Sequence, residues 1–157
     1  MQPEKFRFLA QSVKEAYQII AAELAGERFD LEPEPETLPE DQVISVIVGA
    51  VGNNSKGRIM VEMAMETARR LTEEMNGEPF TDEFEMYLFL AEFANIFSGK
   101  AITKINNTYK GVDLRLTPPA IFTGDKMEIT TPSIQSEIVF FKSESGVAKL
   151  DIGFEGE

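Results

Sequence analysis

The alternation of apolar and polar residues divides the chain into segments typical of helices and strands. Apolar residues recur every three or four positions from Pro3 to Leu24, which predicts an amphipathic helix over residues 3–25 that ends at Gly26. Residues 27–41 carry acidic side chains among three prolines and predict an extended acidic connector with no packed element. We interpret the connector as a solvated loop, with a docking segment for a partner as the alternative.

Runs of apolar and β-branched residues predict two β-hairpins. The first hairpin turns at Asn53–Gly57, and the second turns at the polar segment Lys142–Gly146. In the last strand, Ala148 and Leu150 alternate with Lys149, as expected for a strand with one buried face. The four expected strands are residues 43–51, 58–63, 134–141 and 147–154.

Two further helices are expected between these hairpins. Residues 65–75 show helical spacing and stop at Asn76–Gly77, a common C-terminal signal. Asp82 is placed to cap a long helix that runs to about Asn106. A short strand over residues 112–116 follows, and Pro118–Pro119 ends its pairing.

The order of these elements predicts an α+β fold, in which an antiparallel or mixed β-sheet is covered by long helices. A length of 157 residues suits a single domain over residues 1–157, with its core in residues 42–155.

The composition excludes several classes of function. The sequence contains no cysteine and no histidine, so disulfides, thiolate chemistry, Ser-His triads and ordinary zinc sites are ruled out. The net charge of −12 opposes binding to nucleic acids and to anionic membranes. We find neither a signal peptide nor an apolar run long enough to span a bilayer, so a cytoplasmic protein is expected.

Two polar residues interrupt the otherwise apolar segment Tyr87–Gly99 of the long helix. Glu92 and Asn95 are three positions apart, which places a carboxylate and a carboxamide side by side on one face. Burying both groups without partners is unfavourable, so we expect this face to meet solvent or a binding partner. The alternative is that these residues are only the exposed edge of a core helix.

Other candidate sites have simpler explanations. The segment Asn53–Gly57 resembles an anion-binding loop, but a strand follows it where a phosphate loop requires a helix, so we interpret it as a turn. Adjacent acids such as Glu73 and Glu74 diverge by about 100° around a helix and suit solvated surfaces better than a metal site. We therefore expect no metal site and no cofactor of the chain's own.

The residues of the long helix also carry a family resemblance. Glu92-Phe93-Ala94-Asn95, Gly99 four positions later, Thr117-Pro118-Pro119 and Gly124 resemble the CheX branch of the CheC/CheX/FliY chemotaxis phosphatases. The resemblance extends over about residues 43–154 and includes only one Glu-x-x-Asn pattern. It implies a homodimer, an expectation that the strongly apolar segment Ile134–Phe141 also favours.

The resemblance also implies an activity and roles for particular residues. The substrate would be a phosphorylated CheY-like response regulator, in which Asn95 orients the attacking water and Glu92 pairs with a lysine. Leu88, Glu92 and Gly99 would contact this partner, which would supply Mg²⁺ and the phosphorylated aspartate. Many members of the family carry Asp or Ser where this chain has Leu88.

Two other functions remain open from the sequence. One is a regulator-binding or scaffold domain without catalysis, which the apolar Leu88 favours. The other is an unrelated α+β domain that binds a small molecule.

Overall fold

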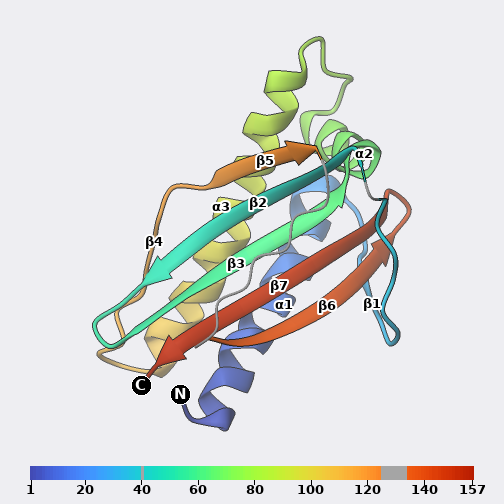
Figure 1. Cartoon of the computed structure of the whole chain (residues 1–157). Helices are drawn as coiled ribbons and strands as arrows, with labels where there is room; N and C mark the ends of the chain where they lie inside the picture. The colour runs from blue at the N-terminus through green and yellow to red at the C-terminus, as the bar shows by residue number, and fades with distance from the viewer. Residues whose placement is uncertain (40, 125–133) are drawn as a thin grey trace.

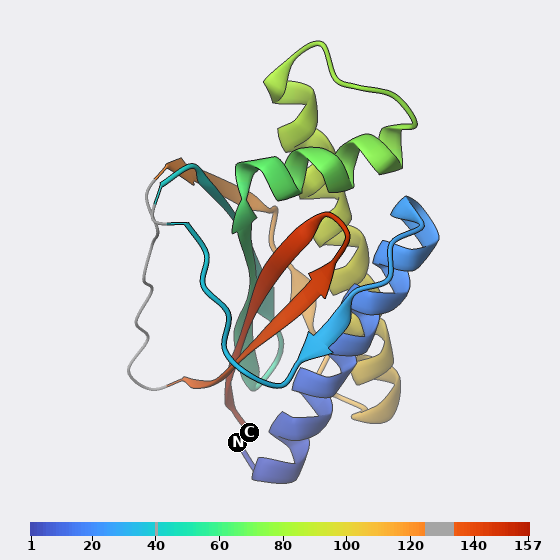
Figure 2. The same ribbon diagram turned by 90° about the vertical axis from the view of Figure 1, so that its right-hand side faces the viewer.

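A seven-stranded sheet carries the long helices α1 and α3 along one face (Figures 1 and 2). The structure is a computed structural model that describes residues 1–39, 41–124 and 134–157. Its helices are α1 (Pro3–Ala25), α2 (Met65–Asn76) and α3 (Glu83–Thr108). Its strands are β1 (Asp30–Glu32), β2 (Val43–Val51), β3 (Ser55–Ala64), β4 (Arg115–Leu116), β5 (Ala120–Gly124), β6 (Gln135–Ser143) and β7 (Gly146–Gly156).

All strand pairs in the sheet are antiparallel, in the order β1-β6-β7-β3-β2-β4, with β5 also paired to β2. The two predicted hairpins are present as β2–β3 and β6–β7. The α+β fold predicted from the order of elements is therefore confirmed.

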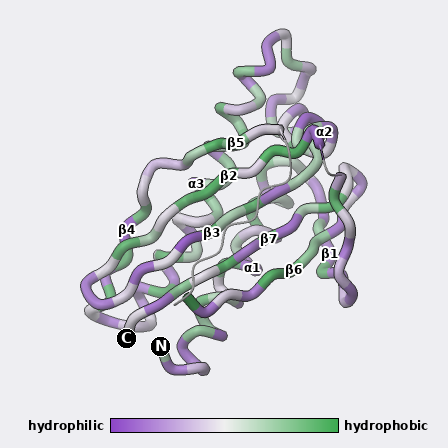
Figure 3. Tube along the Cα trace, in the orientation of Figure 1, coloured by the Kyte–Doolittle hydropathy of each residue, from purple (hydrophilic) through white to green (hydrophobic). Residues whose placement is uncertain are grey.

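The core lies between the helices and the sheet. Alternate residues of β2 and β7 point toward the helices and are fully buried, and the strands show apolar stretches in the hydropathy trace (Figure 3). Tyr17 of α1 lies at the centre of this core, with four phenylalanine rings at centroid distances of 5.1 to 5.4 Å: Phe29, Phe93, Phe97 and Phe141. This aromatic cluster joins α1 to α3 and to β6, and so fixes the position of α3.

Local signals in the sequence correctly predict the helix ends. Gly26 and Gly77 take positive φ angles of 66° and 83° directly after α1 and α2, a conformation that glycine adopts without strain. Asp82 caps α3 by accepting a hydrogen bond of 2.8 Å from the Phe84 N–H. The start of α3 is therefore well defined, which matters because candidate site residues follow it.

The expectation of an acidic connector without packed structure is wrong for part of residues 27–41. Phe29 and Leu38 are buried, and β1 pairs with β6 at the edge of the sheet. The Glu27 carboxylate is also buried and accepts hydrogen bonds of 2.7 and 2.6 Å from the Ser143 and Ser145 hydroxyls. These two serines satisfy a carboxylate that would otherwise be costly to bury. Residue 40 of the connector lies outside the described residues.

Three expectations about strands also need correction. Strand β3 begins at Ser55, so the first turn is shorter than expected, and Gly57 lies within the strand. A Cβ atom on Gly57 would lie 2.3 Å from the Gly153 carbonyl oxygen, so close strand approach explains this glycine. Strand β5 was not predicted, because it resumes pairing with β2 directly after Pro119. Strand β6, whose apolar character was taken to favour a homodimer, has no free edge, because it lies between β1 and β7.

Candidate functional site

A stripe of residues on α3 faces away from the core. Its members are separated by three or four positions and fall within an arc of about 80° around the helix: Phe84, Leu88, Glu92, Asn95 and Gly99. The first two are 60% and 54% exposed, and Glu92 and Asn95 are also exposed, whereas Gly99 is half-buried. The prediction that the face of Glu92 and Asn95 meets solvent is confirmed.

The residues next to this pair explain its orientation. Phe93 and Ala94, which lie between Glu92 and Asn95, are buried against the core, and Phe93 contacts Tyr17 of α1 at a ring distance of 5.4 Å. The helix therefore cannot rotate without exposing these apolar groups. Glu92 and Asn95 make no hydrogen bond or ion pair with any residue that the structure describes. The backbone that carries both side chains is thus held in place, and their polar atoms are available.

The N-terminal turns of α3 extend beyond the sheet (Figures 1 and 2) and are supported by α2 and the loop before α3. Arg69 of α2 lies 3.8 Å from the Glu83 carboxylate. Glu73 of α2 accepts a hydrogen bond of 3.0 Å from the Phe80 N–H, and the Phe80 ring packs on Phe89 at 5.2 Å. These contacts hold the projecting turns in place.

Tyr87 provides a further connection, on the side of the sheet edge. Tyr87 lines the same hollow as Glu83 and as Thr123 of β5. Burial and the neighbouring Glu83 carboxylate raise the pKa of Tyr87, so the hydroxyl stays protonated near neutral pH. Strand β5, absent from the predicted set, therefore helps to position the candidate site.

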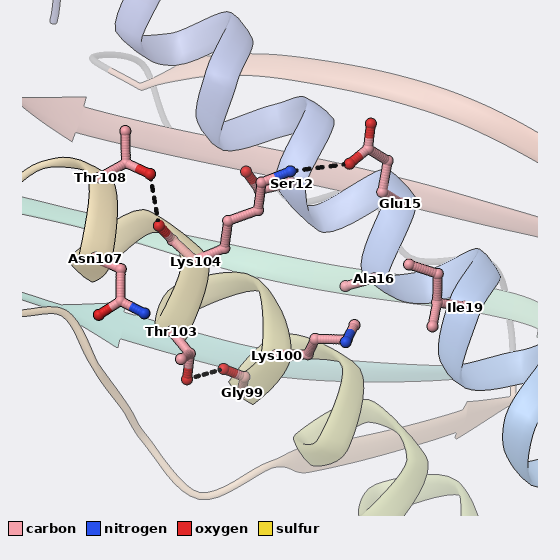
Figure 4. Close-up of a pocket in the computed structure, with 10 residues that line it drawn as sticks. All are labelled: Ser12, Glu15, Ala16, Ile19, Gly99, Lys100, Thr103, Lys104, Asn107 and Thr108. Atoms are coloured by element: carbon pink, nitrogen blue, oxygen red, sulfur yellow. Dashed lines mark hydrogen bonds and ion pairs between the residues drawn. The ribbon is translucent and has the colours of Figure 1, made fainter.

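Gly99 lies where the stripe meets a groove between α1 and α3 (Figure 4). The groove has a volume of about 490 Å³, and its walls carry Ser12, Glu15, Ile19, Lys100, Thr103 and Lys104. The Gly99 carbonyl accepts a hydrogen bond of 2.9 Å from the Thr103 hydroxyl. A Cβ atom on Gly99 would find its nearest neighbour, a methyl of Leu116, at 3.9 Å, so packing within the chain does not require glycine here.

The described residues offer no alternative catalytic centre based on a metal. In residues 1–39, 41–124 and 134–157, no group of three or more acidic side chains is arranged to hold a metal ion. The segment from Asn53 leads into β3 with no helix behind it, so the interpretation as a turn holds for Asn53 and Asn54, while residues 55–57 belong to β3. Among the same residues, no helix has both the length and the hydropathy that a bilayer span requires.

Comparison with known proteins gives a consistent result. The sequence model of the family described as "Chemotaxis phosphatase CheX" matches residues 44–142. The matched range includes the whole of α2 and α3 and nearly all of the strands from β2 to β6, and it ends before β7. A search of curated proteins found no matching sequence.

Several solved structures share this fold. The chemotaxis protein CheX from Vibrio vulnificus is 20% identical, with a TM-score of 0.80 over 94% of this chain and 96% of that one. A CheC-like superfamily protein from Shewanella sp. PV-4 is 21% identical, with a TM-score of 0.78 over 99% and 100% of the two chains. A chain of the CheX–CheY–BeF3–Mg²⁺ complex from Borrelia burgdorferi is 24% identical, with a TM-score of 0.75 over 93% and 97%.

Proposed function

Because the chain belongs to the chemotaxis phosphatase CheX family, we propose that it dephosphorylates a phosphorylated CheY-type response regulator. The observation that carries this proposal is the exposed pair of Glu92 and Asn95, held on an anchored helix without partners among the described residues. Such a pair is free to enter the active site of another protein. The absence of histidine and cysteine is compatible with this reaction, because the proposed role of the chain is to position groups.

In the proposed reaction, Asn95 acts on the attacking water. Its carboxamide oxygen accepts a hydrogen bond from the water, and this orients the water oxygen in line with the bond to be broken. The water oxygen bonds to phosphorus while the bond from phosphorus to the aspartate oxygen breaks. The regulator recovers its carboxylate, and the remaining water proton passes to phosphate or solvent. A loose phosphoryl-transfer transition state needs little help from a strong base, so an amide suffices.

Glu92 would hold the regulator in register for this step. Its exposed carboxylate, one helical turn from Asn95, is placed to pair with a lysine beside the phosphorylated aspartate. Leu88 and Gly99 extend the contact on either side along the same stripe. The contact therefore combines one ion pair with apolar and backbone surface.

We assign the metal ion to the partner. The related Borrelia burgdorferi complex contains CheX, CheY, BeF3 and Mg²⁺. In the proposed complex Mg²⁺ would likewise be bound by the regulator, where it neutralises charge on the phosphoryl oxygens. The chain itself would then contribute Asn95 and Glu92 and no metal ligand.

The direct test is the rate of phosphate loss from a phosphorylated CheY-type regulator, measured with and without this protein. The proposal expects faster loss with a catalytic amount of the protein. Tight binding to the activated regulator with no acceleration would instead support the scaffold function, which the apolar Leu88 beside the polar pair favours.

We also propose that the protein is a homodimer. The face of the sheet opposite the helices exposes large apolar side chains on three different strands: Val51, Phe122 and Ile138. These apolar side chains lie apart on the sheet, and a second protein on this face would bury them. A second copy of the chain is the occupant that the CheX family suggests.

A further inference from the structure

We infer that Phe84 and Leu88 form an apolar patch, the Phe84–Leu88 patch, that binds an apolar surface of the response regulator next to its phosphorylated aspartate. This inference rests on the proposed function and adds a specificity-determining residue, Phe84, to the contact. It also assigns a role to Leu88, which lies where many members of the family have a polar residue.

The first observation is the exposure of two large apolar side chains that the fold does not use. Phe84 and Leu88 are 60% and 54% exposed, one turn apart, whereas Met86 and Leu90 on the opposite side of the same turns are fully buried. Neither helix stability nor core packing requires Phe84 in this position, since its backbone N–H alone bonds to the Asp82 cap. An exposed pair of this kind gains free energy when a partner covers it.

The second observation is continuity with the proposed catalytic pair. The stripe runs from Phe84 through Leu88 to Glu92 and Asn95, over a length of about 16 Å at the helical rise. A partner that receives Asn95 in its active site therefore meets Leu88 and Phe84 on the same approach. The N-terminal turns of α3 stand clear of the sheet (Figure 2), and all four of these residues are exposed.

The third observation is the rigidity of the patch. The turns that carry Phe84 and Leu88 are held by the ion pair of Arg69 with Glu83, by the packing of Phe80 on Phe89, and by the contacts of α3 with β5. A patch on a supported helix loses little conformational entropy on binding, so more of its apolar burial appears as affinity.

Charge around the patch indicates the chemistry of its occupant. Between Arg70 and Lys100 the sequence has no lysine or arginine but seven acidic residues: Glu73, Glu74, Glu78, Asp82, Glu83, Glu85 and Glu92. On α3 and at its cap, the acids next to the patch in the sequence are Asp82, Glu83, Glu85 and Glu92, and Arg69 of α2 pairs with Glu83. The α3 segment that carries the patch is therefore net negative. A complementary surface has apolar side chains bordered by lysine or arginine, and the lysine proposed to pair with Glu92 would belong to that border.

The test measures binding of CheY-type regulators of the source organism, activated with beryllofluoride, to single variants. Replacement of Phe84 or Leu88 by serine (Phe84→Ser, Leu88→Ser) should weaken binding about 10-fold each, as expected for loss of a large buried apolar group. The same factor should appear at low and high salt, since apolar contacts are not screened. KM for dephosphorylation should rise by more than kcat falls.

Two control variants keep the result specific. Leu24→Ser removes a leucine that is 37% exposed on α1, away from the stripe, and should leave binding unchanged. Phe84→Leu retains an apolar side chain and should recover most of the affinity. Equal melting temperatures would show that the serine variants fold.

The outcomes separate this inference from the proposed function. If the unmodified protein binds and dephosphorylates a regulator, and Phe84→Ser binds it as tightly, the inferred binding role of the Phe84–Leu88 patch is wrong while the proposed function stands. If Leu24→Ser weakens regulator binding as much as Phe84→Ser does, the inferred binding role of the patch is also overturned. If the unmodified protein neither binds nor dephosphorylates any of these regulators, both the proposed function and the patch fail.

Discussion

The side chain of Asn106 satisfies both backbone polar groups of Leu114. Its amide donates a hydrogen bond of 3.0 Å to the Leu114 carbonyl oxygen, and its oxygen accepts one of 2.8 Å from the Leu114 N–H. Asn106 thus acts as a strand neighbour would, although it lies in the last turns of α3. The pairing ties the end of α3 to the segment that leads to β4, which lies beside β2.

Asn106→Ala should destabilise the fold by about 1 to 3 kcal/mol, because the buried backbone of Leu114 loses two hydrogen bonds at once. Urea unfolding measures the effect. Asn107→Ala is a matched control, since Asn107 is exposed on the same helix and should change stability little. An unchanged unfolding midpoint for Asn106→Ala would contradict the role given to this pairing.

Asn95→Ala should abolish most of the acceleration of dephosphorylation and leave regulator binding nearly intact. Loss of one positioned hydrogen-bonding group commonly lowers the rate about 10²- to 10³-fold. The measurement is phosphate release at a saturating concentration of the phosphorylated regulator. Asn107→Ala again serves as the control, because it removes an exposed carboxamide from the same helix outside the stripe. Near-normal turnover by Asn95→Ala would exclude orientation of water by this amide.

Glu92→Ala should weaken regulator binding through loss of a charged contact. Added salt should weaken binding of the unmodified protein in the same direction, because exposed ion pairs are screened. Titration of the activated regulator at several salt concentrations tests both points. Glu23→Ala, which removes an exposed carboxylate on α1, should behave like the unmodified protein. If Glu92→Ala binds normally and keeps the full salt dependence, the ion pair lies elsewhere.

The contact of Glu15 with Lys104, at 3.1 Å between α1 and α3, should make stability depend on acid pH. Hydrogen bonds from Gln11 and from Lys104 lower the pKa of Glu15 below its ordinary value of 4.5. The folded state therefore holds this carboxylate ionised more readily than the unfolded chain does. The resulting stabilisation is complete above pH 4.5 and disappears as the pH falls through the folded-state pKa.

Glu15→Gln should accordingly lower the melting temperature slightly near neutral pH and not at all in strong acid. The effect is small because both side chains of the pair are about half exposed. Thermal unfolding at both pH values checks it. A difference between the two proteins that stays constant into strong acid would show that the charge of Glu15 is not its cause.

The homodimer should appear in light scattering at micromolar protein concentration as a species of twice the 17.5 kDa chain mass. Ile138→Lys should shift the equilibrium toward the monomer, since it places a charge on the exposed apolar sheet face. Leu24→Lys, on the helical side of the molecule, should not. A single 17.5 kDa species for the unmodified protein would remove the basis of this proposal.

Much of the fold follows from local sequence signals. The ends of α1, α2 and α3 depend on Gly26, Gly77 and Asp82, which act on the backbone within one turn of themselves. Strands β2 and β7 are also predictable, because β2 is a continuous run of mostly apolar residues and β7 has an apolar residue at every second position from Ala148 to Phe154. In these segments the local preference and the tertiary environment favour the same structure.

The elements that sequence reasoning missed depend on distant partners. Strand β1 contains two acidic residues and forms because it pairs with β6. Glu27 is buried because it accepts hydrogen bonds from Ser143 and Ser145, which lie more than 100 positions away in the sequence. In the candidate site, polar residues in an apolar helix correctly indicated an exposed face. Phe84 was missed because an apolar residue in an apolar helix suggests the core, although its four-residue spacing from Leu88 places it on the stripe.

The two ends of the chain meet at one end of the molecule (Figure 1). Lys5 and Ser55 both donate hydrogen bonds to the Glu157 carbonyl oxygen, while the first turns of α3 project from the other end of the sheet. A tag or surface anchor at either terminus is therefore attached at the end of the sheet opposite the first turns of α3, which include Phe84. Immobilised protein should consequently bind the regulator with the same affinity whichever terminus is fixed. A fluorophore placed near Phe84 should change its emission on binding, whereas one placed near either terminus should not.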